Sequence, residues 1–386
     1  MLSGLLDGIF SGISIGSVLL LAALGLAIVF GLMGVINMAH GEIMMLGAYT
    51  TFVVQNVFKG FGGVWFDLYI FFALIAAFIV TALFGLVLER GVIRYLYGRP
   101  LETLLATWGV SLILQQFVRS VSWVLVIGIV LFCILFFGAL KLLSRRPDFD
   151  RIRNWVITIM LPLSAAIAIV TGIVIGQTYK LAATKPWFGA QNVDVTAPRW
   201  LRGGLPVGDF QLSYARIFII VLTITCVVAV YLFLNRSAWG LRIRSVTQNR
   251  SMSACLGIPT QKVDALTFAL GSGLAGIAGC AVSLLGSVGP NTGQNYIVDT
   301  FMVVVVGGVG KLVGSIVAAI VIGTATYLVG SGTLANLLEP VKPLADFFTF
   351  FATTSMAKVM VFALIVVFLQ FRPAGLFPQK GRTVDA

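Results

Sequence analysis

Polar and ionisable side chains lie inside a long apolar region at 37–42, NMAHGE. Histidine and glutamate serve acid–base catalysis, metal binding or the binding of polar solutes. His40 is the only histidine, so a histidine metal cluster is excluded, and its neighbours suggest no Ser-His-Asp arrangement. A charge within a membrane segment costs about 2.5–3.5 kcal/mol, so Glu42 needs compensation. Two interpretations remain open for Asn37, His40 and Glu42: a helix-breaking turn satisfied by local hydrogen bonds, or a role on a solute pathway.

A second segment, 303–314, has the sequence VVVVGGVGKLVG, in which Gly310 precedes Lys311 as in a phosphate-binding loop. A Walker A motif also needs glycine and Ser or Thr at the positions that Val305 and Leu312 occupy, within a βαβ unit. This segment therefore does not predict ATP hydrolysis. We expect a chain that has no catalytic residues, binds no metal and needs no cofactor.

The composition predicts that these segments lie in a membrane. Hydrophobic residues make up 59% of the 386, charged residues only 10%, and the mean hydropathy is +1.02. Apolar stretches lie at 8–35, 43–58, 68–88, 104–119, 121–143, 155–176, 214–234, 264–287, 300–329 and 355–371. Since a spanning helix needs about 20 apolar residues, we predict an all-α, polytopic transmembrane helical bundle of about 8–10 spans. It forms one domain, 1–386, and some helices are re-entrant or broken.

Glycines gather within the apolar stretches in two places. The first group is Gly31, Gly34, Gly41 and Gly47, and the second is Gly271, Gly273, Gly276, Gly279, Gly307, Gly308, Gly310 and Gly314. Broken helices persist in membranes where they line a cavity or a transport pathway. The alternative is close helix packing through small residues. Both interpretations stay open at each glycine.

Basic residues indicate the orientation of the chain. They cluster at Arg90, Arg94 and Arg99, at Arg145, Arg146, Arg151 and Arg153, at Arg236, Arg242, Arg244, Arg250 and Lys262, and at Arg372, Lys380 and Arg382. In a membrane protein the net charge of +12 indicates basic cytoplasmic loops rather than nucleic-acid binding. The stretches 121–143 and 155–176 then form a hairpin around an arginine-rich turn, 177–213 is an outer loop, and the amino terminus is expected outside.

The most informative loop is 236–262, RSAWGLRIRSVTQNRSMSACLGIPTQK. It predicts a short helix that Gly257 and Pro259 end. Met252, Cys255, Leu256 and Ile258 give this charged loop an apolar face, as expected of a helix that docks into the groove of a partner. A loop that is only solvated is the alternative.

Four segments resemble the integral membrane permeases of ABC importers of the branched-chain amino acid type, a family that includes urea permeases. They are GLAIVFGLMGVINMAHGEIMMLGAYT at 25–50, LERGVIRYLYGRP at 88–100, NRSMSACLGI at 249–258 and FRPAGLFP at 371–378. The resemblance implies cytoplasmic ATP-binding subunits, a second and related permease chain, an extracytoplasmic substrate-binding protein, and a multi-pass location in the bacterial inner membrane.

The resemblance also assigns a cytoplasmic coupling loop to 235–263. Within it, 245–262 resembles the segment that engages the nucleotide-binding subunit, although the Glu-Ala-Ala form of other permeases is absent. The residues expected to couple the chain to the ATPase are Arg250, Met252, Ala254, Leu256, Gly257 and Ile258.

Two segments are more similar to urea permeases than to amino acid permeases: LLATWGVSLILQQFVRSV at 104–121 and FGAQNVDVTAPRWLRGG at 188–204. In urea permeases they lie nearly next to each other, so 122–187 is expected to be an inserted two-span hairpin. Urea is small and neutral and needs hydrogen-bonding groups, so Asn37, His40, Glu42 and Thr107 are candidate pathway residues. The resemblance thus implies a permease subunit of an ATP-driven ABC importer of urea. The alternatives are a branched-chain amino acid importer and, in a different class, a passive urea channel or ion-coupled carrier.

Overall fold

The computed structural model describes residues 2–143, 149–178, 185–189, 191–207, 210–340 and 342–377. Four of the basic residues used to predict orientation, Arg145, Arg146, Lys380 and Arg382, lie outside the described residues, as does Pro378 of the last family-like segment. The chain divides into two units, 1–112 with 193–386 and 113–192, which are described separately.

The first unit is almost entirely helical. Its elements are α1 (Leu2–Met33), α2 (His40–Lys59), α3 (Gly63–Gly91), the 3-10 helix η1 (Ile93–Leu96), the start of α4 (Pro100–Ser120), the 3-10 helix η2 (Arg199–Leu201), β1 (Gly204–Val207), β2 (Phe210–Ser213), α7 (Tyr214–Arg236), α8 (Ala238–Gln248), α9 (Arg250–Cys255), α10 (Thr260–Leu285), α11 (Thr292–Gly307), α12 (Leu312–Gly330), α13 (Thr333–Leu337), α14 (Lys342–Phe350) and α15 (Thr354–Phe371).

Nine helices in the described part of the chain are long and apolar enough to cross a membrane. They are α1, α3, α4, α7, α10, α12 and α15, together with α5 (Trp123–Leu143) and α6 (Phe149–Thr178) of the second unit. The prediction of a polytopic helical bundle with 8–10 spans is therefore confirmed. The chain is a multi-pass membrane protein.

The core of the first unit forms where α1, α2, α3 and α10 meet. Leu21 of α1, Met44 of α2 and Phe268 of α10 are fully buried in one apolar cluster. The predicted glycine group of α10 does not break this helix, which is continuous from Thr260 to Leu285. A β-carbon on Gly276 would collide with Thr81 of α3, and one on Gly279 with the backbone of Met44. Close packing is the role of these glycines.

Glycine does end helices at two other places. Gly34, with φ of 67°, follows α1, and the chain runs without helix to His40, where α2 begins. The predicted apolar stretch 300–329 is not one helix: α11 ends at Gly307 and α12 begins at Leu312. Hydropathy alone did not reveal this break because apolar residues lie on both sides of it.

The expected outer loop contains structure that the sequence did not predict. β1 and β2 form a two-stranded antiparallel hairpin, and Val193 and Val288 form an isolated antiparallel bridge. The carbonyl of Thr196 accepts hydrogen bonds from Gln55 of α2 and Tyr69 of α3 at 3.1 and 2.9 Å. These contacts hold the segment around Val193 and Thr196 against α2, α3 and Val288 of the same unit.

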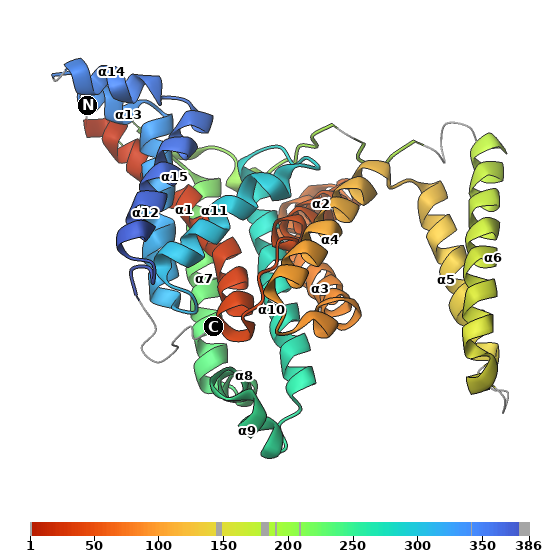
Figure 1. Cartoon of the computed structure of the whole chain (residues 1–386). Helices are drawn as coiled ribbons and strands as arrows, with labels where there is room; N and C mark the ends of the chain where they lie inside the picture. Colours follow the sequence, from red (N-terminus) through yellow and green to blue (C-terminus); the bar gives the residue numbers. More distant parts are fainter. Residues whose placement is uncertain are drawn as a thin grey trace. The chain divides into compact units, whose positions relative to one another are not determined.

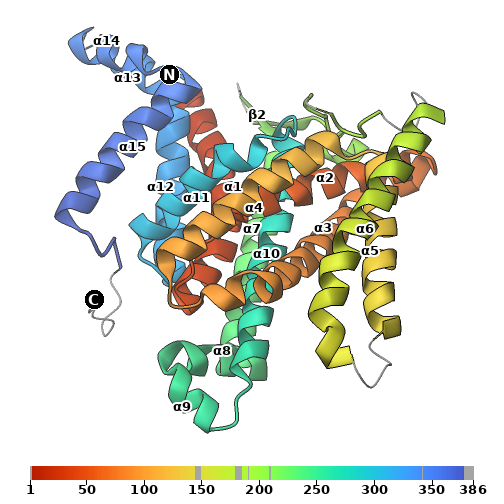
Figure 2. The same cartoon turned by 45° about the vertical axis from the view of Figure 1, so that its right-hand side comes forward.

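Helices α8 and α9 project beyond the ends of α7 and α10, which they connect (Figures 1 and 2). Figure 1 shows the amino-terminal end of α1 at the opposite end of this unit. The arrangement agrees with an outer amino terminus if α8 and α9 are cytoplasmic, although the orientation itself stays a prediction.

In the second unit, α5 and α6 pack against each other, and most of their apolar side chains are exposed. A cavity of about 650 Å³ between them is lined by Ser122, Leu125, Gly128 and Ala168 among others. Two apolar helices with exposed side chains suit a lipid environment. That 122–187 is an insertion stays a prediction.

Candidate substrate pathway and coupling surface

The structure brings the four predicted pathway residues together at the start of α2. Asn37, His40, Glu42 and Thr107 are all buried. Asn37 lies in the non-helical segment before α2, where its side-chain oxygen accepts a hydrogen bond from the backbone nitrogen of Ala39 at 3.1 Å. This bond closes the turn that starts α2, so the local hydrogen-bonding role is present for Asn37.

His40 joins α2 to α1. Its Nε2 donates to the carbonyl oxygen of Ala22 at 3.0 Å, and a β-carbon on Gly25 of α1 would lie 3.0 Å from the imidazole ring. The carbonyl can only accept, so Nε2 carries the proton. The Nδ1 atom has no hydrogen-bond partner among the described residues. His40 thus packs closely against α1 and keeps one ring nitrogen without a protein partner.

Helix α4 supplies the other side of the cluster. The backbone nitrogen of Met38 donates to Thr107 Oγ1 at 3.1 Å, and Ser111 Oγ donates to Glu42 Oε1 at 3.2 Å. Thr107 and Ser111 are four residues apart and share one helix face. Ser111 was not predicted, although its i, i+4 spacing from Thr107 was a signal that could have found it.

Glu42 also approaches α11. A β-carbon on Gly293 would collide with Glu42 Oε2, so only glycine leaves room for this carboxylate. The buried glutamate therefore sits where α2, α4 and the first turn of α11 meet. A hydroxyl group and a carboxylate meet there, whereas the imidazole of His40 faces α1 and the amide of Asn37 bonds within the turn before α2. Buried ionisable groups within a membrane segment commonly mark a site for a polar solute.

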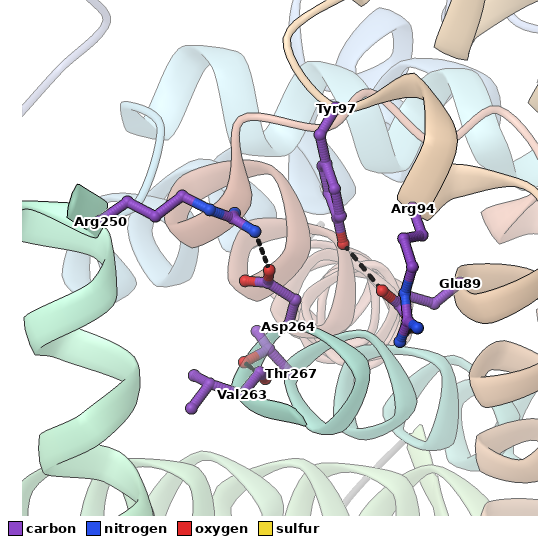
Figure 3. A network of polar contacts seen from close by, with 7 residues as sticks. All are labelled: Glu89, Arg94, Tyr97, Arg250, Val263, Asp264 and Thr267. Carbon is purple, nitrogen blue, oxygen red and sulfur yellow. Dashed lines mark hydrogen bonds and ion pairs between the residues drawn. The ribbon is translucent and has the colours of Figure 1, made fainter. Parts of the chain in front are cut away.

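A second polar network lies at the end of the first unit where α9 projects (Figure 3). Arg250 Nη2 is 2.6 Å from Asp264 Oδ2, Arg94 Nη2 is 3.4 Å from Glu89 Oε2, and the Tyr97 hydroxyl donates to Glu89 Oε1 at 3.3 Å. Both carboxylates are buried, whereas both arginines are partly exposed. These residues line a cavity of about 550 Å³.

Tyr97 connects the two halves of this network. Its ring lies under the guanidinium group of Arg250, 5.1 Å from ring centroid to carbon, while its hydroxyl reaches Glu89 of α3. Burial, with Asp264 and Glu89 nearby, raises the pKa of Tyr97, so the hydroxyl stays a proton donor at physiological pH. Tyr97 therefore links the first residue of α9 to the end of α3. Its role was not predicted, because it depends on α9 folding back toward η1.

Helix α9 presents the predicted apolar face. Asn249 caps its start by accepting from the Met252 nitrogen at 3.0 Å, and Gly257, with φ of 79°, follows its end. Met252 is 59% exposed and Leu256 74% exposed, and Ala254 and Gly257 are also exposed. The structure thus places Arg250, Met252, Ala254, Leu256 and Gly257 around one projecting helix.

Ile258 differs from the other predicted coupling residues. It packs against the buried cluster of Ile243, Val246 and Val263 rather than projecting with Met252 and Leu256. The apolar pattern in the sequence did not separate these positions, because α9 ends before Gly257 and Ile258 lies beyond the positive-φ turn. Ile258 anchors the segment to α8 and α10.

A family model described as "Branched-chain amino acid transport system / permease component" matches residues 8–369. The high-affinity branched-chain amino acid transport system permease protein BraD of Pseudomonas aeruginosa is 25% identical over 378 residues, which are 96% of this chain and 95% of that protein. The corresponding LivH of Escherichia coli is 23% identical over 377 residues, 96% and 94% of the two chains. The ribose import permease protein RbsC of Bacillus subtilis is 29% identical over 104 residues, 25% and 32% of the two chains. No solved structure is significantly similar.

Proposed function

This chain belongs to the permease-component family of branched-chain amino acid transport systems, and we propose that it forms half of the membrane pathway of an ATP-driven importer of branched-chain amino acids. The observation that carries the proposal is the extent of the similarity: the family model runs from α1 to α15, and the relatives BraD and LivH match over 96% of the chain. As a permease component, the chain is a transport subunit and not itself an enzyme.

The proposal requires partners that supply what a permease lacks. A cytoplasmic ATP-binding subunit would dock on the exposed apolar side chains of Met252 and Leu256. A second permease chain would complete the pathway and engage a second ATP-binding subunit, and an extracytoplasmic binding protein would deliver the substrate. A short helix with exposed apolar side chains suits docking in a groove. We propose that the second permease is a related chain rather than a second copy of this one.

The contacts within the first unit suggest how ATP-driven movement would reach the pathway. A displacement of α9 would pull α10 through Arg250 and Asp264, and α3 through Tyr97 and Glu89. Helix α10 packs closely against α2 through Gly279, and α2 begins at the buried residues Asn37, His40 and Glu42. Binding of nucleotide would thus shift the balance between two arrangements of the helices around Glu42.

Urea is the second candidate substrate. Two segments, 104–121 and 188–204, are similar to urea permeases, and the first contributes Thr107 and Ser111 to the polar cluster. Hydroxyl and amide groups such as those of Thr107, Ser111 and Asn37 could bind a small neutral amide. The names of the relatives favour amino acids, so urea ranks second.

Reconstitution tests the proposal. The chain is placed in liposomes with its partner permease, ATPase subunits and binding protein, and uptake of radiolabelled leucine and urea is followed with and without ATP. We expect ATP-dependent uptake of leucine but not of urea. ATP-dependent uptake of urea alone would replace the proposed substrate by the second candidate. Uptake that does not require ATP would identify a passive channel or an ion-coupled carrier and would contradict the proposal.

A further inference from the structure

A separate pair of opposite charges lies between α11 and α15. Lys358 Nζ is 2.7 Å from Asp299 Oδ2, and it also donates to the carbonyl oxygen of Asn295 at 3.2 Å. The ammonium lies 5.8 Å from the centre of the Tyr296 ring. Lys358 belongs to a helix that is apolar enough to span the membrane. No sequence motif singled out these residues.

The pair borders a cavity of about 440 Å³. Its polar lining also includes Asn295, Tyr296, Thr326, Thr354 and Ser355. Asp299 is largely buried, with 9% of its side chain exposed, whereas 32% of the Lys358 side chain is exposed. The two charged side chains therefore lie at the wall of a cavity that residues of four helices line.

Stability does not account for this arrangement. A buried ion pair contributes little net stability, since the loss of hydration offsets the attraction between the charges, and apolar residues of similar size often serve equally well. Ionisable residues inside membrane segments are costly and commonly mark a site for a solute or ion. An ion pair that faces a cavity with several polar side chains fits this second role better than a purely structural one.

The cavity also has an apolar side. Ile15 and Leu19 of α1 belong to its lining and lie one turn apart on the same helix face. A ligand that suits these walls carries a negative group for Lys358, a positive group for Asp299 and a small apolar portion for α1. Urea carries neither charge and has no apolar portion.

We propose that this cavity is a binding site for the zwitterion of a small apolar amino acid. The ligand carboxylate binds the Lys358 ammonium, the ligand ammonium binds the Asp299 carboxylate, and the side chain contacts Ile15 and Leu19. The inference rests on the proposed function and deepens it, because it adds a specific site for the substrate class. Without an amino acid the two side chains contact each other, and the zwitterion replaces this one contact by two.

Cysteine protection tests the site in the assembled transporter. Ser355 lies in the cavity lining and is exposed, so Ser355→Cys offers a thiol for a small charged methanethiosulfonate reagent. The native Cys133 and Cys255 are replaced by serine, since Cys255 is exposed and Cys133 partly so. The matched control is Ser331→Cys, an exposed position in the turn after α12. The transporter is reconstituted in liposomes of phosphatidylglycerol, which has no zwitterionic headgroup that could occupy the cavity.

We expect leucine to slow labelling of Ser355→Cys at least fivefold and to leave Ser331→Cys unchanged. Leucinamide, which lacks the carboxylate, and urea should not protect. Lys358→Met and Asp299→Asn should each abolish protection, whereas Lys358→Arg should retain most of it. The Arg variant separates loss of the charge from a failure to assemble.

Three results would overturn the inference: a Ser355→Cys thiol that is not labelled without leucine, labelling that leucine does not slow, or protection that survives Lys358→Met. Addition of phosphatidylethanolamine tests the other source of a zwitterion. Protection by this lipid and not by leucine would identify a headgroup site and reject the proposal. ATP-dependent leucine uptake is measured on the same samples. Uptake without protection rejects only this site, whereas protection without uptake rejects the proposed import function.

Discussion

The guanidinium group of Arg250 lies 2.6 Å from the carboxylate of Asp264 and thereby joins the first residue of α9 to the second turn of α10. Asp264 is buried, whereas half of the Arg250 side chain is exposed. The two partners are therefore not equivalent. Loss of Arg250 leaves a carboxylate in the protein interior, but loss of the Asp264 charge leaves an arginine that can turn toward water.

We expect Arg250→Gln to lower thermal stability more than Asp264→Asn, by a cost of about 1–3 kcal/mol for the unpaired buried group. Both variants should bind the ATPase subunits yet reduce ATP-driven uptake about tenfold. Uptake by the double variant should be no lower than uptake by the more impaired single variant, because the two side chains act through one contact. Arg244→Gln, which alters an exposed arginine bonded to Asn235, is the control. Additive effects in the double variant would argue against a shared contact.

Tyr97 makes two separable contacts, one through its ring and one through its hydroxyl. Tyr97→Phe keeps the ring under Arg250 and removes the hydrogen bond to Glu89, whereas Tyr97→Leu removes both. ATP-driven uptake should fall severalfold in Tyr97→Phe and further in Tyr97→Leu. Equal uptake in the two variants would show that the ring contact contributes nothing.

The raised pKa of Tyr97 sets the pH dependence of this contact. Below about pH 10, the ordinary value, the hydroxyl is protonated in both the folded and the unfolded chain, so its contribution to stability is constant. Above that value the unfolded chain loses the proton first, and the contribution declines. The ratio of wild-type to Tyr97→Phe uptake should therefore be constant between about pH 6 and pH 9. A change in this ratio over that range would contradict the assignment.

Gly257 has a positive φ of 79°, and no atom of the described residues lies within 4 Å of a β-carbon added there. Backbone conformation, rather than space, thus restricts this position. Gly257→Val should cost about 1–2 kcal/mol of local strain and reduce stimulation of the ATPase by the permease. Gly257→Asn should retain most of the stimulation, because asparagine adopts this conformation more readily. Equal losses would indicate that side-chain size at the ATPase contact is the restriction.

Substitution of an exposed apolar residue of the α9 segment should have a different effect from substitution of a packed one. Leu256→Asp, on the exposed face, should abolish co-purification of the ATPase subunits and leave the melting temperature of the permease unchanged. Ile258→Asp should lower the melting temperature, because Ile258 packs against Ile243, Val246 and Val263. Retention of the ATPase by Leu256→Asp would exclude this face as the docking surface.

The carboxylate of Glu42 provides a test of the pathway assignment. Glu42→Gln keeps the shape and can still accept from Ser111, but it removes the charge. If the charge serves transport, uptake falls while thermal stability is equal or higher. Ser111→Ala should lower stability by about 1–3 kcal/mol, since a buried acceptor loses this donor. Undiminished uptake in Glu42→Gln would leave only a structural role for this carboxylate.

The hydropathy of the chain was sufficient to predict the helical bundle, because each span can be recognised from the length of its own apolar stretch. It was not sufficient for α2, which carries His40, Glu42 and Gln55 and lies outside the set of candidate spans in the described chain. The glycine pattern left helix breaking and close packing open, and the structure shows a helix end at Gly34 after α1 but a continuous α10. Whether a glycine breaks a helix or allows close packing depends on the neighbouring helix, and the sequence does not state which helix that is.

The pathway cluster could be predicted in part because His40 and Glu42 are conspicuous among apolar residues. Ser111 and Thr107 are ordinary side chains for a helix, and only their contacts with Met38 and Glu42 distinguish them. The ion pair of Lys358 and Asp299 was missed for a similar reason. These residues are 59 positions apart, and nothing near either one indicates the other.

The polar start of α2 bears on how the chain enters the membrane during synthesis. This helix is poorly suited to insert alone, since Glu42 and His40 oppose transfer into lipid. The hydrogen bonds described for the cluster connect it to Ala22, Thr107 and Ser111, all within the first 111 residues. The amino-terminal helices can therefore satisfy these groups before α10 is synthesised. A truncated chain ending after α4 should accordingly integrate α2, and Ser111→Ala should impair that step before the transporter exists.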